Sequence, residues 1–379
     1  MRSRTITGPP PGTRVEDVPA VPGLGGLYVR GAAGSLAARL RLPGRARPGA
    51  LPAVAYRVRD VRIDADHLTA YQHLVGEPAL DAVPSGYLHV LAFPVATAVM
   101  VRDDFPLPLL GMVHVANAAS LLRPVRVGDE LEITAWTQDL RPHRRGRQLD
   151  VVAEVRVAGE VAWRGVSTYL AKAPTSAPPP PAPGAQSAAS RGAPAAPAAP
   201  GTPSAEFGGS SRVRGSQAPN WRADPELDGS GPTPGRDGGG RGRGHDSGGP
   251  GPDARVADGD GGEHDGEASA RWRLDAGVGR RYGAVSGDRN PIHMSALSAK
   301  AFGFPRTIAH GMYTAARALA AVGPGRGETY DWSVEFAKPV LLPGTVSVQV
   351  THPEPGCAAY VGTHPRTGAP HFSGTVTRT

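Results

Sequence analysis

The sequence is poor in cysteine and has no long apolar segment. Cys357 is the single cysteine among 379 residues, so no internal disulfide bond and no cysteine-rich metal site can form, and we expect a reducing cytoplasm. The longest apolar stretch, Leu91 to Val101, is interrupted by Pro94. Neither a signal peptide nor a membrane-spanning helix is predicted.

Aromatic residues are also scarce, at 6%, while the formal net charge is +7. A basic chain suits either nucleic acid or an anionic small substrate. The segment GRGRG, residues 240–244, resembles an RNA-binding tract, but acidic residues are interleaved around it and almost no aromatic side chains are present for base stacking. We therefore interpret it as part of a flexible tether and expect no nucleic-acid partner.

Glycine and proline are abundant, with 51 and 40 residues, and they are concentrated in the middle of the chain. From about residue 173 to about residue 266 the sequence has too few large apolar side chains to offset the entropy of ordering the chain. We predict a disordered linker there. It separates an N-terminal region, residues 1–172, from a C-terminal region, residues 267–379.

The two regions contain a weak internal repeat. Arg62–Glu77 aligns with Arg273–Asp288 without a gap, and Arg123–Ile133 aligns with Lys338–Val348 at nearly the same offset. Two matching segments in the same order indicate a duplicated unit.

Each repeat has one apolar helix-like stretch followed by strand-like runs. The helices are expected at residues 87–101 and 312–323, the second starting after Gly311 and ending at Gly323-Pro324. Runs rich in β-branched and aromatic residues follow at 112–125, 129–140, 149–159 and 160–172, and at 329–340, 344–353, 357–365 and 371–378. We predict an α+β fold in which each repeat wraps an antiparallel sheet around a long helix.

The segment YGAVSGDRNPIH, residues 282–293, brings an acid and an imidazole together on a turn that Pro291 restricts. Asp288 and His293 could bracket one water molecule and exchange protons with it and with a carbon atom. The alternative is a structural turn in which Asp288 caps the helix that begins near His293.

A second segment, IAHGMYTAARALA, places His310 and Gly311 at the start of the apolar helix. Free N–H groups at a helix start, with a glycine that permits close approach, could stabilise the charge that develops on a thioester carbonyl oxygen. The alternative is a glycine selected for packing alone.

Together these two segments resemble the signature of the MaoC-type dehydratases, or (R)-specific enoyl-thioester hydratases. The matching residues are Tyr282, Gly287, Asp288, Asn290, Pro291, Ile292 and His293, then Ala309, His310, Gly311 and Met312. The resemblance implies a double hotdog fold and reversible hydration of a trans-2-enoyl thioester of CoA or acyl carrier protein to the (3R)-3-hydroxyacyl thioester, in fatty-acid or polyketide metabolism.

The resemblance also implies roles for individual residues. Asp288 and His293 would form the acid–base pair, Asn290 would orient them, and the N–H of Gly311 would be the oxyanion donor. Substrate contacts are expected from Tyr282, His310 and Met312. No metal and no organic cofactor are implied.

The first repeat departs from this signature. Glu77 stands opposite Asp288, but Ala79, Leu80 and Ala82 replace Asn290, Pro291 and His293, and a looser alignment places Phe93-Pro94 near His310-Gly311. Without the imidazole we expect this repeat to be catalytically silent and to shape the acyl tunnel.

A basic segment, RPHRRGRQ at residues 141–148, lies between two expected strands. Arg144 and Arg145 could meet CoA phosphates or an acidic carrier protein, or the segment could be a solvated loop. Two other functions stay open: an acyl-thioester-binding subunit without catalysis, and a hotdog thioesterase. A fused pseudo-dimer could be complete as a monomer, and a homodimer is possible.

Overall fold

The computed structural model describes residues 8–39, 49–109, 111–172 and 267–379. The predicted linker, residues 173–266, lies outside the described residues. Within the described ranges, no helix combines the length and apolar character needed to span a bilayer.

The first repeat contains six strands and three helices. In chain order they are β1 (Arg14–Asp17), α1 (Leu24–Arg39), β2 (Val54–Arg62), α2 (Ala65–Val75), α3 (Ser85–Met100), β3 (Met112–Leu121), β4 (Glu130–His143), β5 (Gly146–Val157) and β6 (Glu160–Lys172). Most side chains of α3 are buried, as expected for a helix covered by a sheet.

The described part of the second repeat, residues 267–379, follows the same order without counterparts of β1 and α1. Its elements are β7 (Glu267–Leu274), α4 (Val278–Ser286), α5 (Pro291–Met294), α6 (Ala296–Ala301), α7 (Gly311–Val322), the short 3₁₀ helix η1 (Gly323–Arg326), β8 (Tyr330–Phe336), β9 (Gly344–Glu354), β10 (Cys357–Thr363) and β11 (Pro370–Arg378). Helix α7 starts and stops at the two glycines that the sequence indicated.

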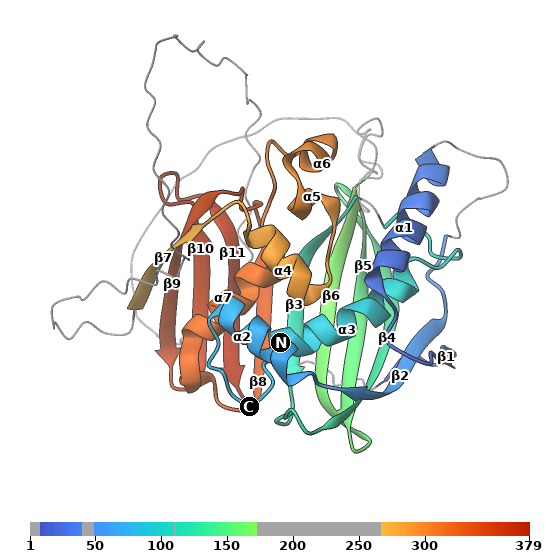
Figure 1. Cartoon of the computed structure of the whole chain (residues 1–379), viewed down its shortest axis with the longest axis horizontal. Coiled ribbons are helices and arrows are strands. Elements are labelled where there is room, and N and C mark those ends of the chain that lie inside the picture. The colour runs from blue at the N-terminus through green and yellow to red at the C-terminus, as the bar shows by residue number, and fades with distance from the viewer. Residues whose placement is uncertain (1–7, 40–48, 110, 173–266) are drawn as a thin grey trace, which may run out of the picture. The chain divides into compact units, whose positions relative to one another are not determined.

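All eleven strands of the described residues form one sheet, in the order β1-β2-β4-β5-β6-β3-β8-β11-β10-β9-β7. The repeats join where β3 pairs antiparallel with β8, from Ala116 opposite Glu335 to Leu121 opposite Tyr330. Helices α3 and α7 lie against the same face of this sheet (Figure 1). The expected double hotdog is therefore confirmed.

One detail of the repeat alignment was wrong. Helix α3 begins at Ser85, after Pro84, so Phe93-Pro94 lies inside the helix. The residue equivalent to Gly311 at the helix start is therefore Ser85. The sequence alignment failed here because α3 has 16 residues whereas α7 has 12, and small apolar residues repeat along both.

Contacts between the repeats extend beyond the sheet. Helix α2 packs against both α4 and α7. A ring nitrogen of His67 lies 2.8 Å from the carbonyl oxygen of Val285, and the carboxylate of Glu77 forms a buried ion pair with Arg326 at 2.6 Å. These contacts place the turn that carries Asp288 beside the first repeat.

Candidate active site

The turn between α4 and α5 is held by hydrogen bonds within its own sequence. Gly287 adopts the left-handed conformation that ends α4, with φ 71°. The N–H of Asn290 donates to Oδ1 of Asp288 at 3.1 Å, and Oδ1 of Asn290 accepts from the N–H of Ile292. Asn290, rather than Asp288, is thus the N-cap of α5, with Pro291 as its first residue.

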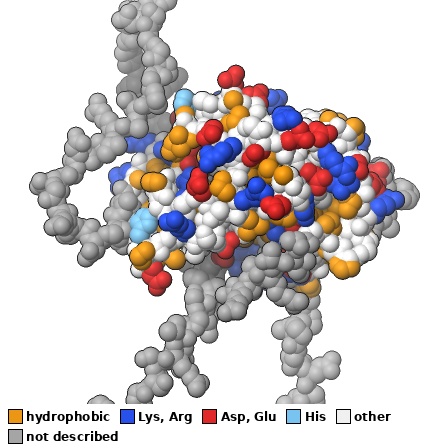
Figure 2. Space-filling view, turned by 90° about the horizontal axis from the view of Figure 1, so that it is seen from below, with side chains coloured by type: hydrophobic (Ala, Val, Ile, Leu, Met, Phe, Trp, Pro, Cys, Tyr) orange, Lys and Arg blue, Asp and Glu red, His pale blue; other side chains and the backbone are white. Residues whose placement is uncertain are grey.

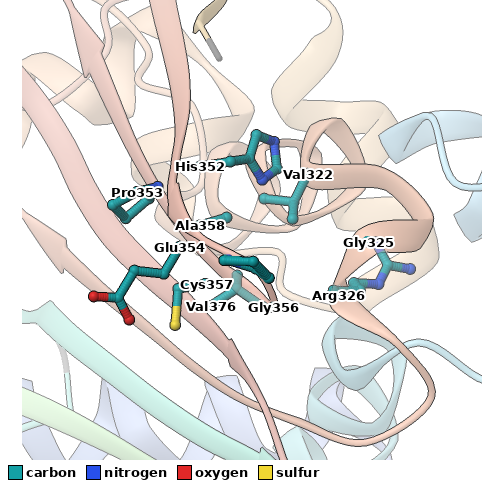
Figure 3. A pocket seen from close by; sticks show the side chains of 11 residues that line it. Val322, Gly325, Arg326, His352, Pro353, Glu354, Gly356, Cys357, Ala358 and Val376 are labelled. Carbon is teal, nitrogen blue, oxygen red and sulfur yellow. The ribbon is translucent and has the colours of Figure 1, made fainter. Parts of the chain in front are cut away.

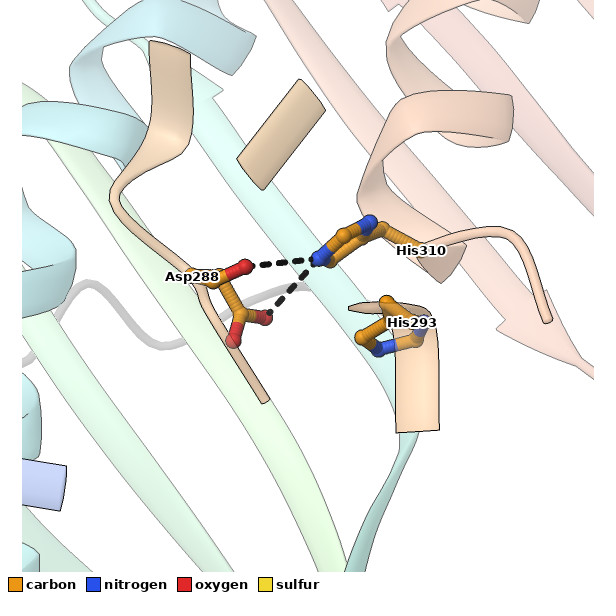
Figure 4. A group of neighbouring side chains, drawn as sticks. All are labelled: Asp288, His293 and His310. Carbon is orange, nitrogen blue, oxygen red and sulfur yellow. Dashed lines mark hydrogen bonds and ion pairs between the residues drawn. The ribbon is translucent and has the colours of Figure 1, made fainter. Parts of the chain in front are cut away.

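Two histidines meet Asp288 at this turn. Nε2 of His310 lies 2.9 Å from the backbone oxygen of Asp288 and 3.8 Å from its Oδ2 (Figure 4). The rings of His293 and His310 stack with centroids 3.6 Å apart. One polar atom from each of the three side chains lies within 4.8 Å of the others, so the structure brings Asp288 and His293 together at the start of α7.

Carbonyl partners define the tautomers of the two rings. Nδ1 of His293 lies 2.8 Å from the carbonyl oxygen of Ile308, which can only accept, so Nδ1 carries the proton. For the same reason Nε2 of His310 is the protonated nitrogen. This leaves Nε2 of His293 as an acceptor, and Nδ1 of His310 buried without a partner among the described residues.

At neutral pH, burial and neighbouring charges give Asp288 a different protonation state from the two histidines. Burial, and then the neighbouring His310, lower the pKa of His293 to about 3, and burial also lowers the pKa of His310. Burial alone would raise the pKa of Asp288, but the attraction that His310 and His293 exert when they are protonated, together with the donors to the carboxylate, outweighs burial and lowers that pKa. The site therefore holds one carboxylate beside two neutral imidazoles.

A residue far away in the sequence contacts the carboxylate. The hydroxyl of Tyr28, on α1, donates to Oδ1 of Asp288, 260 residues away. Leu24 of the same helix lies where a side chain on Gly287 would otherwise stand. Sequence reasoning missed Tyr28, because α1 has no counterpart in the repeat and carries no motif.

The N-terminus of α7 completes the site. His310 is the N-cap and makes no side-chain capping bond, which leaves the first N–H groups of the helix without a side-chain cap. A Cβ atom at Gly311 would lie 2.9 Å from the ring of Phe336. Gly311 therefore allows the helix start to pack against this ring. Its position agrees both with an oxyanion donor and with a glycine selected for packing.

The expected substrate contacts lie in three different places. Tyr282 is buried behind His310, with ring centroids 5.0 Å apart, and Met312 is part of the core. Arg144 and Arg145 are exposed in the turn between β4 and β5. His310 itself contacts Asp288, as described above.

Asp288, His293 and His310 are also a group that could hold a metal ion, with one ligand atom from each. One ring nitrogen of each histidine and Oδ1 of Asp288 are already held by Ile308, Tyr28 and the backbone of Asp288. Hydrogen bonds that hold a side chain in one orientation would serve a metal ligand and an acid–base pair equally.

A cavity of about 340 Å³ lies at the opposite end of α7 (Figure 3). It is bordered by Val322, Arg326, the turn between β9 and β10, and Cys357 at the start of β10. Because α7 has 12 residues, its two ends are about 18 Å apart. The cavity therefore does not adjoin Asp288 and His293.

Comparisons with known proteins agree with this geometry. Residues 274–361 match the model of the MaoC-like domain. The 3-hydroxyacyl-thioester dehydratase X of Mycobacterium tuberculosis is 30% identical over 321 residues, which cover 82% of this chain and 88% of that protein. The crystal structure of HtdX from the same organism superimposes with a TM-score of 0.59 at 27% identity, covering 86% of this chain and all of that one.

A more distant structure shares the fold alone. A MaoC-like dehydratase from Phytophthora capsici has a TM-score of 0.54 at 14% identity, with 86% of this chain and 94% of that chain covered. The similarity to the mycobacterial dehydratase extends over both repeats, and the matched domain includes the turn with Asp288 and the start of α7. The chain belongs to the MaoC-like dehydratase family.

Proposed function

We propose that this protein is a hydro-lyase that reversibly hydrates trans-2-enoyl thioesters to (3R)-3-hydroxyacyl thioesters. The observation that carries the proposal is the meeting of Asp288, His293 and the start of α7 in one buried site. The name of the mycobacterial relative, 3-hydroxyacyl-thioester dehydratase X, supports the same chemistry.

In the proposed mechanism, one water molecule sits between the carboxylate of Asp288 and Nε2 of His293. As the water oxygen bonds to the β-carbon, one of these two groups accepts a proton from the water. The pair then gives this proton to the α-carbon and returns to its starting protonation state. The negative charge that moves onto the thioester oxygen is stabilised by the N–H of Gly311 at the helix start. The reaction consumes one water and needs no other reactant.

Three further residues hold the pair in place. His310 donates to the backbone of Asp288, and Asn290 caps the helix that carries His293. Tyr28 occupies Oδ1 of Asp288, which leaves Oδ2 as the oxygen for water. We assign Tyr28, Asn290 and His310 as positioning residues.

Contacts in the first repeat support the proposal that this repeat has no catalytic activity. The N–H of Ser85, at the start of α3, donates to the hydroxyl of Tyr330 at 3.3 Å, and Oγ of Ser85 accepts from Nε1 of Trp163 at 2.7 Å. Glu77, opposite Asp288 in the repeat, is engaged by Arg326. Side chains of the protein thus occupy the donor and the carboxylate that a second site would use.

The exposed turn with Arg144 and Arg145 is our proposed contact for CoA phosphates or an acidic carrier protein. Its support is its charge. On the face of the molecule that Figure 2 shows, basic and acidic side chains are interspersed. We also propose that the chain is divided into regions 1–172, 173–266 and 267–379, and that two chains can form a homodimer.

The test follows the loss of conjugated enoyl absorbance with a short trans-2-enoyl-CoA. We expect turnover by the wild type and a loss of about 10²- to 10⁴-fold in kcat for Asp288→Asn and for His293→Gln. Glu77→Gln is the matched change in the first repeat. The folded fraction of this variant should have the same kcat as the wild type.

Three results would contradict the mechanism in different ways. Turnover that survives both substitutions would remove Asp288 and His293 from the chemistry. Thioester binding without turnover by the wild type would favour an acyl-binding subunit. Release of free CoA thiol instead of hydration would favour a thioesterase.

A further inference from the structure

Five polar side chains lie together in the core of the first repeat, outside the catalytic group. They are His89 of α3, His114 and Asn117 of β3, and Ser167 and Tyr169 of β6, and we call them the polar cluster. In the sheet, His114 stands opposite Tyr169 and Asn117 opposite Ser167. The ring of His114 stacks on Tyr169 at 4.8 Å and on His89 at 6.1 Å.

Two atoms of the polar cluster lack partners among the described residues. Oγ of Ser167 donates to Oδ1 of Asn117 at 3.0 Å, but the amide nitrogen of Asn117, a residue only 2% exposed, has no acceptor. Nε2 of His114 is likewise buried and unpaired. Because a buried polar group without a partner is destabilising, a ligand atom or a water molecule is expected there.

The polar cluster is uncharged at neutral pH. Burial lowers the pKa of His89 to about 4, and burial together with His89 lowers the pKa of His114 to about 3. Burial raises the pKa of Tyr169 above its ordinary value. An anionic group would find no counter-charge and would face the carboxylate of Asp288, whereas a hydroxyl or carbonyl oxygen could use these donors and acceptors.

The polar cluster adjoins the catalytic site. The ring of His114 meets that of Phe336 edge-on at 5.4 Å, and Phe336 packs directly against Gly311. The charge of Asp288 influences the pKa of His89, His114 and Tyr169. These rings are therefore within reach of the acyl chain of a thioester whose carbonyl lies at Gly311 and whose α- and β-carbons lie at Asp288 and His293.

A small cavity begins at the same side chains. His89, Ser167 and Tyr169 line one part of it, and the rest is apolar, formed by Ala92, Phe93, Ala96, Val151, Ala153, Trp163 and Gly165. Its volume of about 10 Å³ is room for one water molecule, so side chains must move to admit an acyl chain. Its lining, part polar and part apolar, suits a carbon chain with one oxygen.

We propose that the polar cluster is an acyl subsite for substrates that carry an uncharged hydroxyl or carbonyl oxygen beyond the β-carbon. This inference rests on the proposed hydration activity and adds the class of acyl group that the enzyme prefers. The competing occupant is a single buried water molecule, with an unsubstituted alkyl chain as the substrate.

The experiment compares trans-2-octenoyl-CoA with its 5-, 6- and 7-hydroxy derivatives. For the wild type we expect at least one hydroxy derivative to have a kcat/KM about 10-fold or more above that of the parent. In His114→Phe and in Asn117→Leu, this ratio should fall by about 10- to 100-fold, because one polar partner is lost in each. The Ala118→Ser variant, on the opposite and exposed face of β3, should keep the ratio.

Crotonyl-CoA separates failure of the subsite from failure of the proposed function. Its four-carbon acyl group has one carbon beyond the β-carbon and no oxygen there to use these donors and acceptors, so its kcat/KM should change by less than about twofold in folded variants. Equal ratios in the wild type and in both variants, with crotonyl-CoA still hydrated, would overturn the subsite and leave a buried water in its place. No turnover of any thioester by the wild type would overturn the proposed hydratase activity itself.

Discussion

At the scale of single residues, the hydroxyl of Tyr28 controls how the carboxylate of Asp288 is presented. Tyr28→Phe removes the donor to Oδ1 but keeps the ring. That donor helps to lower the pKa of Asp288, so its loss should raise this pKa and move the acid limb of the kcat/KM profile to higher pH. We also expect kcat to fall by about 10-fold, with KM nearly unchanged.

The other titratable groups near Asp288 do not oppose this shift in its pKa. In the proposed mechanism the carboxylate is the active form, so activity should be present above its pKa and lost as pH falls through it. His293 and His310 face it from α5 and α7, with Tyr282 on α4 and His89, His114 and Tyr169 on the first-repeat side; all of these have pKa values shifted toward their neutral forms. None gains charge as pH rises from 5 to 7.

Val29→Ala is the matched control for Tyr28→Phe. Val29 neighbours Tyr28 on α1 and is 71% exposed, so its truncation should leave both the pH profile and kcat in place. An acid limb that is the same in Tyr28→Phe as in the wild type would show that the hydroxyl does not position the carboxylate.

Local spacing explains which site residues the sequence could predict. Asp288, Asn290 and His293 lie within one turn, and Gly311 marks a helix start, so their roles can be inferred from short segments. Tyr28 reaches the site only through the packing of α1, and His310 contacts Asp288 only because α4 and α7 meet. Such contacts depend on tertiary structure, which no local pattern encodes.

At the scale of elements, the start of α7 depends on a close fit between Gly311 and the ring of Phe336. Gly311→Ala would place a methyl group 2.9 Å from that ring. We expect a loss of about 1–3 kcal/mol in the free energy of unfolding and a lower kcat, because the helix start must move away from Asp288. Thermal unfolding and enoyl hydration measure the two effects.

Two variants test whether the cause is this contact. Gly325→Ala adds a methyl group where nothing lies within 4 Å, and should change neither quantity by much. Phe336→Leu should provide room, so the double variant Gly311→Ala/Phe336→Leu should recover part of the lost stability. A double variant as unstable as the sum of both single changes would mean that the two residues do not interact.

The elements themselves were largely readable from the sequence. The helix at 312–323 and the strand runs were confirmed, because Gly and Pro mark their ends and β-branched residues fill the strands. Helix α1, by contrast, follows no amphipathic pattern and was not anticipated. The alignment of Phe93-Pro94 with His310-Gly311 was wrong because α3 and α7 differ in length, so the start of α3 could not be located from the sequence.

At the scale of the whole molecule, the chain between the repeats should be replaceable. Every site residue lies within 8–172 or 267–379, so we predict that a Gly/Ser segment of equal length in place of residues 173–266 leaves kcat/KM within about twofold. Enoyl hydration by this variant is the measurement, with the full chain as control. A well-folded variant without activity would show that residues 173–266 contribute to the site.

The repeat in the sequence predicted two similar units but not how they join. The pairing of β3 with β8 connects strands more than 200 residues apart, and nothing in either strand identifies its partner. The same is true of the contact between Glu77 and Arg326. A sequence pattern can indicate that a strand exists, but its neighbour across a repeat boundary is decided by packing.

The buried ion pair between Glu77 and Arg326 makes the two repeats depend on each other. The side chains are only 4% and 14% exposed, so Glu77→Gln leaves the charge of Arg326 without its partner in a largely dry environment. We expect a loss of about 3–5 kcal/mol in the free energy of unfolding, measured by urea denaturation. Glu77→Leu/Arg326→Met, which removes both charges, should recover most of it.

An exposed pair supplies the control for this prediction. Arg62 and Glu130 also form an ion pair between neighbouring strands, but their side chains are 66% and 49% exposed, so Glu130→Gln should cost at most about 1 kcal/mol. If Glu77→Gln were no more costly than Glu130→Gln, the pair would not couple the repeats. Because Glu77 and Arg326 lie in different repeats, a coupling of the expected size should make both repeats unfold in one transition. The turn that carries Asp288 would then lose its support when the first repeat unfolds.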